Sequence, residues 1–176
     1  YEPYAMPRLP LRTAFLLGAV LILAGCGFQL RGASTATALP ESWRQMHLVT
    51  GNPNSEFGRE VKARFAANGI TWVDRDEATH ILRLGPENFS QRNLSLNAEA
   101  RAAEFELTMR ANFSVDEASG EEVMETAGAA VIKQMENDPR NVVGKAEEIR
   151  ILKVEMRTEL AQQILRRIVF YAASAE

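Results

Sequence analysis

The clearest pattern in this sequence is a strict alternation of apolar and polar side chains over residues 104–116. The six apolar positions are Phe105, Leu107, Met109, Ala111, Phe113 and Val115. Because successive side chains of a strand point to opposite faces of a sheet, this period of two predicts a long strand with one buried face. Residues 118–120 (Ala-Ser-Gly) are typical of a turn. We therefore expect residues 122–135 to pair back with the long strand as a hairpin.

The last apolar pattern has the period of a helix. Over residues 145–172, apolar side chains recur in steps of three and four and form one continuous stripe. The stripe consists of Ile149, Leu152, Met156, Leu160, Ile164, Ile168 and Tyr171. At 1.5 Å per residue, this predicts one amphipathic helix roughly 40 Å long.

The first half of the chain predicts shorter elements. Residues 45–50 are typical of a strand, and residues 81–84 of a second one. Between them, residues 55–68 have the pattern of a helix, with apolar residues four apart at Phe57, Val61 and Phe65. Residues 85–97 are less regular, but their apolar positions indicate that part of this segment extends the second strand.

These elements follow the order β-α-β-β-β-α, which predicts an α+β fold. We expect a two-layer sandwich in which two helices pack on one face of a mixed four-stranded sheet. The first β-α-β unit should form a right-handed parallel crossover, and the later strands should be antiparallel. The second face of the sheet would be left for solvent or a partner.

Residues 1–25 have the features of a secretory signal peptide. Met6 is the expected start, so residues 1–5 are not expected to be native. Arg8 and Arg12 supply the positive charge, and residues 14–23 are apolar throughout. This run is about half of the roughly 20 residues that a membrane-spanning helix needs.

Leu23-Ala24-Gly25-Cys26 ends this segment and resembles the bacterial lipobox. That resemblance implies a diacylglyceryl group on the Cys26 thiol, cleavage before Cys26 and acylation of the new amino terminus. A plain signal peptide with an incidental cysteine is the alternative. Gly27 follows, and the absence of an aspartate there favours the outer membrane. We expect a lipidated N-terminus and tether over residues 26–40 and a single α+β domain over residues 41–176.

Composition and charge suggest a binding protein more than an enzyme. The net charge of −3 does not point to nucleic acid. A single cysteine cannot form an internal disulfide, and His47 and His80 lie too far from it to suggest a zinc site. We also find no catalytic or nucleotide-binding motif. The sequence therefore predicts no enzymatic activity, no metal and no cofactor.

The mature amino terminus, residues 26–32 (Cys-Gly-Phe-Gln-Leu-Arg-Gly), resembles that of the LptE (RlpB) family of lipopolysaccharide-assembly lipoproteins. Leu82-Arg83-Leu84-Gly85 and Ala103-Glu104-Phe105 resemble the family's second and third strands. Asp138-Pro139, Lys145, Glu155-Met156-Arg157 and the segment from Leu160 to Arg167 resemble its closing loop and helix. The resemblance covers residues 26–170.

The resemblance implies a function that the periodicities do not show. LptE-like proteins form a one-to-one complex with the β-barrel protein LptD, sit in its lumen as a plug, bind lipopolysaccharide and help to place it in the outer leaflet. The alternative is an accessory structural lipoprotein of another envelope complex. A lipid-anchored hydrolase would need a clustered nucleophile and base, which we do not find.

The resemblance also suggests where lipopolysaccharide binds. Lys145 matches a basic position of the family before the last helix. A second basic position of the family aligns with Ala98 instead, and Arg101 lies near it. Arg140 adds a cation in the same loop as Lys145, beside the apolar pair Val142-Val143. Lys145, Arg140 and Arg101 are therefore the predicted lipopolysaccharide-binding residues.

Overall fold

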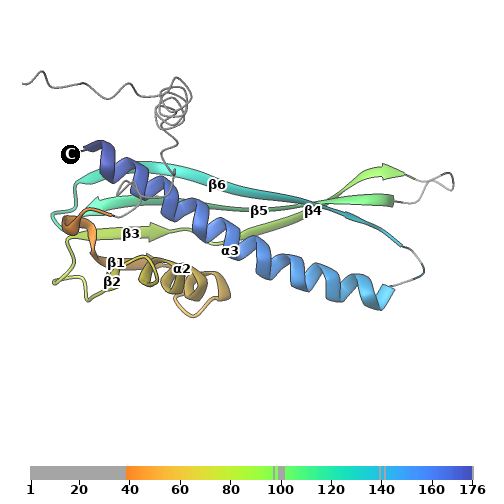
Figure 1. The fold of residues 1–176 in the computed structure, drawn as a ribbon, viewed down its shortest axis with the longest axis horizontal. Helices are drawn as coiled ribbons and strands as arrows, with labels where there is room; N and C mark the ends of the chain where they lie inside the picture. Colours follow the sequence, from red (N-terminus) through yellow and green to blue (C-terminus); the bar gives the residue numbers. More distant parts are fainter. Residues whose placement is uncertain (1–38, 97, 99–101, 139, 141, 176) are drawn as a thin grey trace, which may run out of the picture. The chain divides into compact units, whose positions relative to one another are not determined.

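The structure is a computed structural model that describes residues 39–96, 98, 102–138, 140 and 142–175 (Figure 1). The predicted signal peptide, Cys26, the tether up to residue 38 and Arg101 lie outside the described residues. The elements are η2 (Glu41–Trp43), β1 (Gln45–Thr50), α2 (Glu56–Ala66), β2 (Thr71–Trp72), β3 (His80–Leu84), β4 (Asn88–Leu96), β5 (Ala102–Glu117), β6 (Glu122–Glu136) and α3 (Val142–Ala175).

The six-stranded sheet confirms the predicted fold class but corrects the predicted number of four strands. Its order is β2-β1-β3-β5-β4, and β6 pairs with β5. The pairs of β1 with β2 and β3 are parallel, and the remaining pairs are antiparallel. Strand β2 has two residues, which is too short to leave a pattern in the sequence. Strand β4 is a separate strand within residues 85–97.

Strands β3 and β4 lie end to end along one edge of β5. Residues 113–117 of β5 pair with β3, and residues 102–110 pair with β4. The break comes at Gly85, whose amide nitrogen donates to the Asn112 carbonyl oxygen at 2.8 Å. A Cβ at Gly85 would lie 3.1 Å from that oxygen, so the break needs a glycine. The expectation that part of residues 85–97 extends the second strand is therefore wrong, because β3 ends at Leu84 and β4 begins anew at Asn88.

The helices begin and end where local chemistry allows. The Ser55 side chain accepts a hydrogen bond from the Gly58 amide and caps the N-terminus of α2. Gly69 stands just beyond its C-terminus with φ +89°, a left-handed conformation that favours glycine. Helix α3 starts at Val142, three residues before the predicted start, and ends at Ala175, three residues beyond the predicted end.

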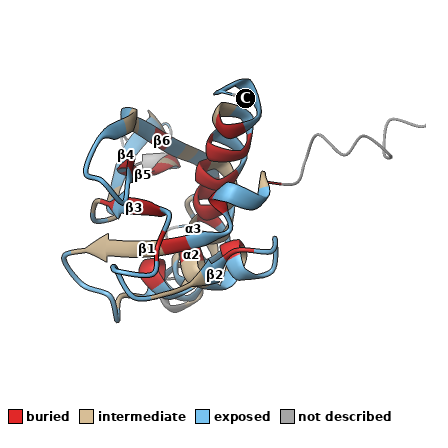
Figure 2. Cartoon of the chain, turned by 90° about the vertical axis from the view of Figure 1, so that its left-hand side faces the viewer, coloured by how far each residue is buried: buried red, intermediate tan, exposed pale blue. Residues whose placement is uncertain are grey.

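Both helices cover the same face of the sheet, as predicted (Figure 2). The six alternating apolar residues of β5 are all buried and point toward the helices. The middle of the α3 stripe, from Met156 to Ile168, completes the core, while Ile149, Leu152 and Tyr171 are partly buried against it. The opposite sheet face is polar and has no helix over it in the described part of the chain.

A polar stripe on α3 covers the outer edge of β6. Gln163 accepts a hydrogen bond from the Ala130 amide, Arg167 donates to the Gly128 carbonyl oxygen, and Tyr171 donates to the Val123 carbonyl oxygen. Glu155 and Glu159 both pair with Lys133 of β6. These five α3 residues are four apart, so one helical face satisfies backbone groups that would otherwise be open to another strand.

Candidate functional site

Two of the predicted lipopolysaccharide-binding residues, Lys145 and Arg140, lie at one end of the domain. We call this end the tip: β4, residues 102–110 of β5, residues 130–136 of β6 and residues 142–155 of α3. Figure 1 shows the start of α3, the end of β4 and the start of β5 at this end, opposite the C-terminus. The third predicted residue, Arg101, lies outside the described residues.

Lys145 lies in the first turn of α3, and its ammonium group lies over the Phe105 ring. The Nζ atom is 4.0 Å from the ring centroid. Phe105 is buried and sits in register between Asn93 of β4 and Met135 of β6. The Lys145 side chain therefore covers a residue of the core.

Lys145 makes no ion pair with any residue that the structure describes. Two other cations of the tip are neutralised. Arg92 donates two hydrogen bonds to the Glu106 carboxylate, and Arg150 donates two to Glu147. The hydrogen bond from Arg92 is the main reason why the pKa of Glu106 is lowered. An incoming anion could pair with Lys145 without breaking an existing ion pair.

Arg140 is a weaker candidate than Lys145. Its side chain is 91% exposed, but its Nε atom lies 3.3 Å from an oxygen of Asp138. The Arg140 amide donates to the same oxygen at 2.9 Å, and this backbone hydrogen bond is the main cause of the lowered pKa of Asp138. Arg101 and the side chains of Val142 and Val143 lie outside the described residues.

Lys153 repeats the arrangement of Lys145 two helical turns further along α3. Its Nζ atom lies 4.1 Å from the Phe89 ring centroid, and the structure gives it no ion pair with a described residue. Sequence reasoning missed this residue as a possible anion contact. The sequence spacing could have indicated Lys153 in part, because eight residues along a helix place the two lysines close to the same helical face.

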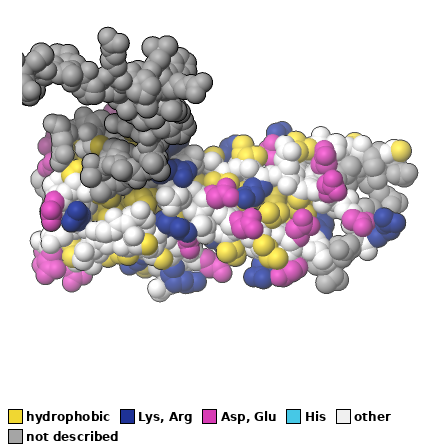
Figure 3. Space-filling model, viewed as in Figure 1, with side chains coloured by type: hydrophobic (Ala, Val, Ile, Leu, Met, Phe, Trp, Pro, Cys, Tyr) yellow, Lys and Arg dark blue, Asp and Glu magenta, His cyan; other side chains and the backbone are white. Residues whose placement is uncertain are grey.

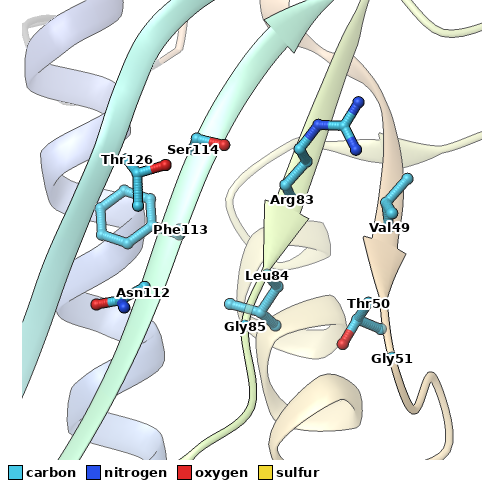
Figure 4. A pocket seen from close by; sticks show the side chains of 10 residues that line it. All are labelled: Val49, Thr50, Gly51, Arg83, Leu84, Gly85, Asn112, Phe113, Ser114 and Thr126. Carbon is cyan, nitrogen blue, oxygen red and sulfur yellow. The ribbon is translucent and has the colours of Figure 1, made fainter.

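A shallow pocket with both polar and apolar lining residues opens on the sheet face that the helices leave bare (Figure 4). It has a volume of about 320 Å³ and lies where β1 and β3 end beside β5 and β6. Polar side chains from four strands line it, namely Thr50, Arg83, Asn112, Ser114 and Thr126. Arg83 pairs with the buried Asp116 at 2.5 Å, so its charge is already compensated. None of the predicted site residues lies here.

The two histidines serve the fold. The His80 ring is buried and stacks on Trp43 with centroids 3.9 Å apart. His47 is half-buried, with Nδ1 2.9 Å from the Val73 carbonyl oxygen. Among the described residues, no cluster of metal-ligating side chains is present.

The surface of the tip combines basic and apolar side chains, and its charged side chains are of both signs. Figure 3 shows Lys and Arg side chains interspersed with Asp and Glu over the helix side, with apolar side chains between them. Leu94 and Leu96 of β4 and Ile151 of α3 are exposed apolar residues of the tip. Within the described residues, no helix has the length and apolar character needed to cross a membrane. Such a surface suits an anionic amphiphile better than a polyanion.

Solved structures share this fold. The crystal structure of rare lipoprotein B from Shewanella oneidensis has a TM-score of 0.67 and 26% identity, with 74% of this chain and 98% of that chain covered. The solution structure of an uncharacterized lipoprotein B from Nitrosomonas europaea has a TM-score of 0.70 and 21% identity, and covers 84% of this chain and 94% of that one. The second likeness concerns the fold alone.

The sequence is similar to proteins named LPS-assembly lipoprotein LptE. The protein from Photorhabdus laumondii is 28% identical over 156 residues, which cover 88% of this chain and 83% of that protein. The protein from Yersinia pestis is 30% identical over 157 residues, which cover 88% and 73% respectively. The family described as "LptE: Lipopolysaccharide-assembly" matches residues 43–168. The predicted resemblance and the absence of an enzymatic role are thus confirmed, and the chain belongs to the LptE family of lipopolysaccharide-assembly lipoproteins.

Proposed function

We propose that this protein is held at the outer membrane by a lipid on Cys26 and forms a one-to-one complex with the LptD β-barrel. It would sit in the barrel lumen as a plug, support barrel assembly and help to place lipopolysaccharide in the outer leaflet. Residues 1–25 would be the removed signal peptide, residues 26–40 the lipidated terminus and tether, and residues 41–176 the plug domain. Family membership and the names of the relatives support this role.

The observation that carries the plug proposal is the bare polar face of the sheet. Exposed polar side chains of β4 and β5, including Ser90, Arg92, Arg110 and Asn112, lie on this face. The interior of a large outer-membrane barrel is polar, and its width grows with the number of strands. A polar sheet face can meet such a wall through hydrogen bonds, whereas an apolar face could not.

A pull-down from detergent-solubilised outer membranes tests the complex. The full chain, tagged after Glu176, should recover the barrel in equal amount. Arg110→Trp adds bulk to the bare face and should lower the recovery several-fold. Arg59→Trp is the matched control at an exposed position of α2. This variant should recover as much barrel as the parent protein. Recovery of a different envelope complex in place of the barrel would favour the accessory-lipoprotein alternative.

The anchor has its own test. Mass spectrometry of the mature protein should show an amino-terminal Cys26 that carries three acyl chains. Several chains give stable anchoring, whereas one chain alone is marginal. Cys26→Ser should leave an unprocessed precursor. Mature protein with an unmodified Cys26 would contradict the anchor without affecting the barrel test.

Lipopolysaccharide binding is proposed at the tip, with Lys145 as the main contact and Arg140 and Arg101 as secondary ones. A phosphate gains charge-assisted hydrogen bonds from lysine or arginine, typically about 1.5–3 kcal/mol each. Lys145 offers a cation without an anionic partner among the described residues, directly beside a ring of the core. The exposed leucines of β4 supply nearby apolar surface for acyl chains.

A further inference from the structure

One row of side chains on the tip part of α3 carries two lysines with an apolar residue between them. The members of this row are four residues apart and form one of the ridges that run along a helix, namely Lys145, Ile149, Lys153 and Arg157. Ile149 is half-buried and packs against the core. Arg157 ends the row, and its charge is compensated by two glutamates. The row therefore offers two cations that are separated by an uncharged side chain.

Two aromatic rings of the sheet fix the positions of these lysines. The Nζ atoms lie 4.0 Å from the Phe105 ring centroid and 4.1 Å from the Phe89 ring centroid. Phe89 of β4 pairs with Met109 of β5, which is four residues, or roughly 13 Å, from Phe105 along the strand. Eight residues of α3 advance about 12 Å along the helix axis. Because the two spacings match, the rings hold two ammonium groups about two helical turns apart.

Both ammonium groups can accept an anionic partner. Within the described part of the chain, neither Lys145 nor Lys153 forms an ion pair. By contrast, Lys133 on β6 is engaged by Glu155 and Glu159 of the same helix. A lysine ammonium group has three donors, and a ring on one side leaves donors free for a phosphate on the other. Both lysines are half-buried, so their apolar stems are already ordered against the protein.

We propose that Lys145 and Lys153 form one site for a ligand with two separated phosphates, in which each lysine binds one of them. The proposal rests on the lipopolysaccharide binding of the proposed function, and it adds Lys153 as a binding residue and the chemical class of the ligand. Lipid A fits this class, because it carries a phosphate at each end of a glucosamine disaccharide. Its two sugars would lie over Ile149, between the lysines.

The test compares diphosphoryl lipid A with monophosphoryl lipid A, in detergent, as ligands of the full chain. The parent protein should bind the diphosphoryl form about 10-fold more tightly, because only this form engages both lysines. Lys153→Gln should weaken binding of the diphosphoryl form about 5- to 10-fold. The same variant should bind the monophosphoryl form within about twofold of the parent, because Lys145 still holds the one phosphate.

Two variants serve as controls, with circular dichroism as the check of folding. Lys153→Arg keeps the charge and should retain the preference for the diphosphoryl form. Lys62→Gln removes a half-buried lysine of α2, outside the tip, and should leave both affinities unchanged. A folded Lys153→Gln protein that keeps the parent's preference, or that loses affinity for both forms equally, would overturn the proposal.

Failure of the proposed function gives a different result. If Lys145→Gln and Lys153→Gln both bind diphosphoryl lipid A as tightly as the parent, the tip does not bind lipopolysaccharide and both proposals fail. If Lys145→Gln weakens this binding and Lys153→Gln does not, the lipopolysaccharide site of the proposed function stands and the two-phosphate site does not exist.

Discussion

The two ends of this domain differ in how completely helices cover the sheet. At the base, which comprises β1–β3, α2, residues 111–117 of β5 and residues 156–175 of α3, side chains from both helices and the sheet are fully buried. At the tip, no residue of β4 is buried, and no described side chain of α3 before Met156 is buried. Phe105, Leu107 and Met109 of β5 are buried at the tip as well, so the base holds the larger part of the core and the tip the smaller, more exposed part.

The largest expected effect compares two phenylalanines. Phe113 at the base is 1% exposed, whereas Phe89 at the tip is half-buried. Phe113→Ala should lower the free energy of unfolding by about 3–5 kcal/mol, because it leaves a cavity in the core. Phe89→Ala should cost roughly 1–2 kcal/mol. Urea denaturation of both variants measures the difference, and equal losses would remove the distinction between base and tip.

Two arginine–glutamate clusters give the next comparison. Arg157 is 16% exposed and binds Glu87 at 2.7 Å and Glu56 at 2.6 Å, which ties α3 to the β3–β4 break and to α2. Arg157→Gln should lower the free energy of unfolding by about 1.5–3 kcal/mol. Arg150→Gln breaks the exposed pair with Glu147 and should cost far less, because solvent screens that pair. Similar losses for the two variants in urea denaturation would show that burial does not decide the strength of these pairs.

A pH dependence should arise at the base from His80. Burial is the main cause of its lowered pKa, against the opposing charge of Glu117. The unfolded state therefore takes up a proton first as the pH falls below about 6.5. The free energy of unfolding should decrease from that pH until the folded pKa of His80 is passed. The pKa values of the tip carboxylates Glu106 and Glu147 are also lowered. Their contribution to the free energy of unfolding is lost only below pH 4.5, the ordinary pKa of a glutamate side chain.

His80→Gln should therefore flatten the pH dependence of stability below pH 6.5 and leave the acid limb below 4.5 in place. Urea denaturation at a series of pH values measures both slopes. An unchanged slope between these two values in the variant would assign the dependence to another group.

The smallest expected effect on folding lies in the two lysine–ring contacts of the tip. Lys145→Gln and Lys153→Gln should each lower the free energy of unfolding by about 0.5–1 kcal/mol, because each loses one cation–π contact at a partly exposed site. Thermal unfolding followed by circular dichroism suffices for this comparison. A loss of several kcal/mol for Lys145 alone would mean that it is a structural residue and a poor probe of binding.

Periodicity predicted the long elements, because β5 and α3 each bury one face over many residues. The edges of the sheet were not predictable in this way. The two residues of β2 carry no pattern, and β4 exposes nearly all its side chains, so its sequence has no regular alternation that would set it apart as a separate strand. The division of one edge of β5 between β3 and β4 depends on a close approach of Gly85 to Asn112, which only the tertiary structure shows.

The sequence indicated which residues to consider for the candidate site, but it did not indicate the contacts that those residues make. Lys145 and Phe105 are 40 positions apart in the sequence, so their contact depends on how α3 returns along the sheet. The pairing of Arg140 with Asp138 and the second lysine over a ring likewise follow from the fold. The family resemblance supplied the function, which no spacing of residues in this chain encodes.

Lipopolysaccharide binding by the full chain and by two matched variants tests the central claim most directly. Lys145→Gln and Lys153→Gln each remove a lysine over a ring on the same helix, at almost equal distances. We expect Lys145→Gln to weaken binding about 10- to 100-fold, the equivalent of one charge-assisted hydrogen bond. Lys145→Arg should preserve binding, and Lys153→Gln should weaken it less than Lys145→Gln does. If the folded Lys145→Gln protein binds lipopolysaccharide as tightly as the parent, the tip is not the binding site.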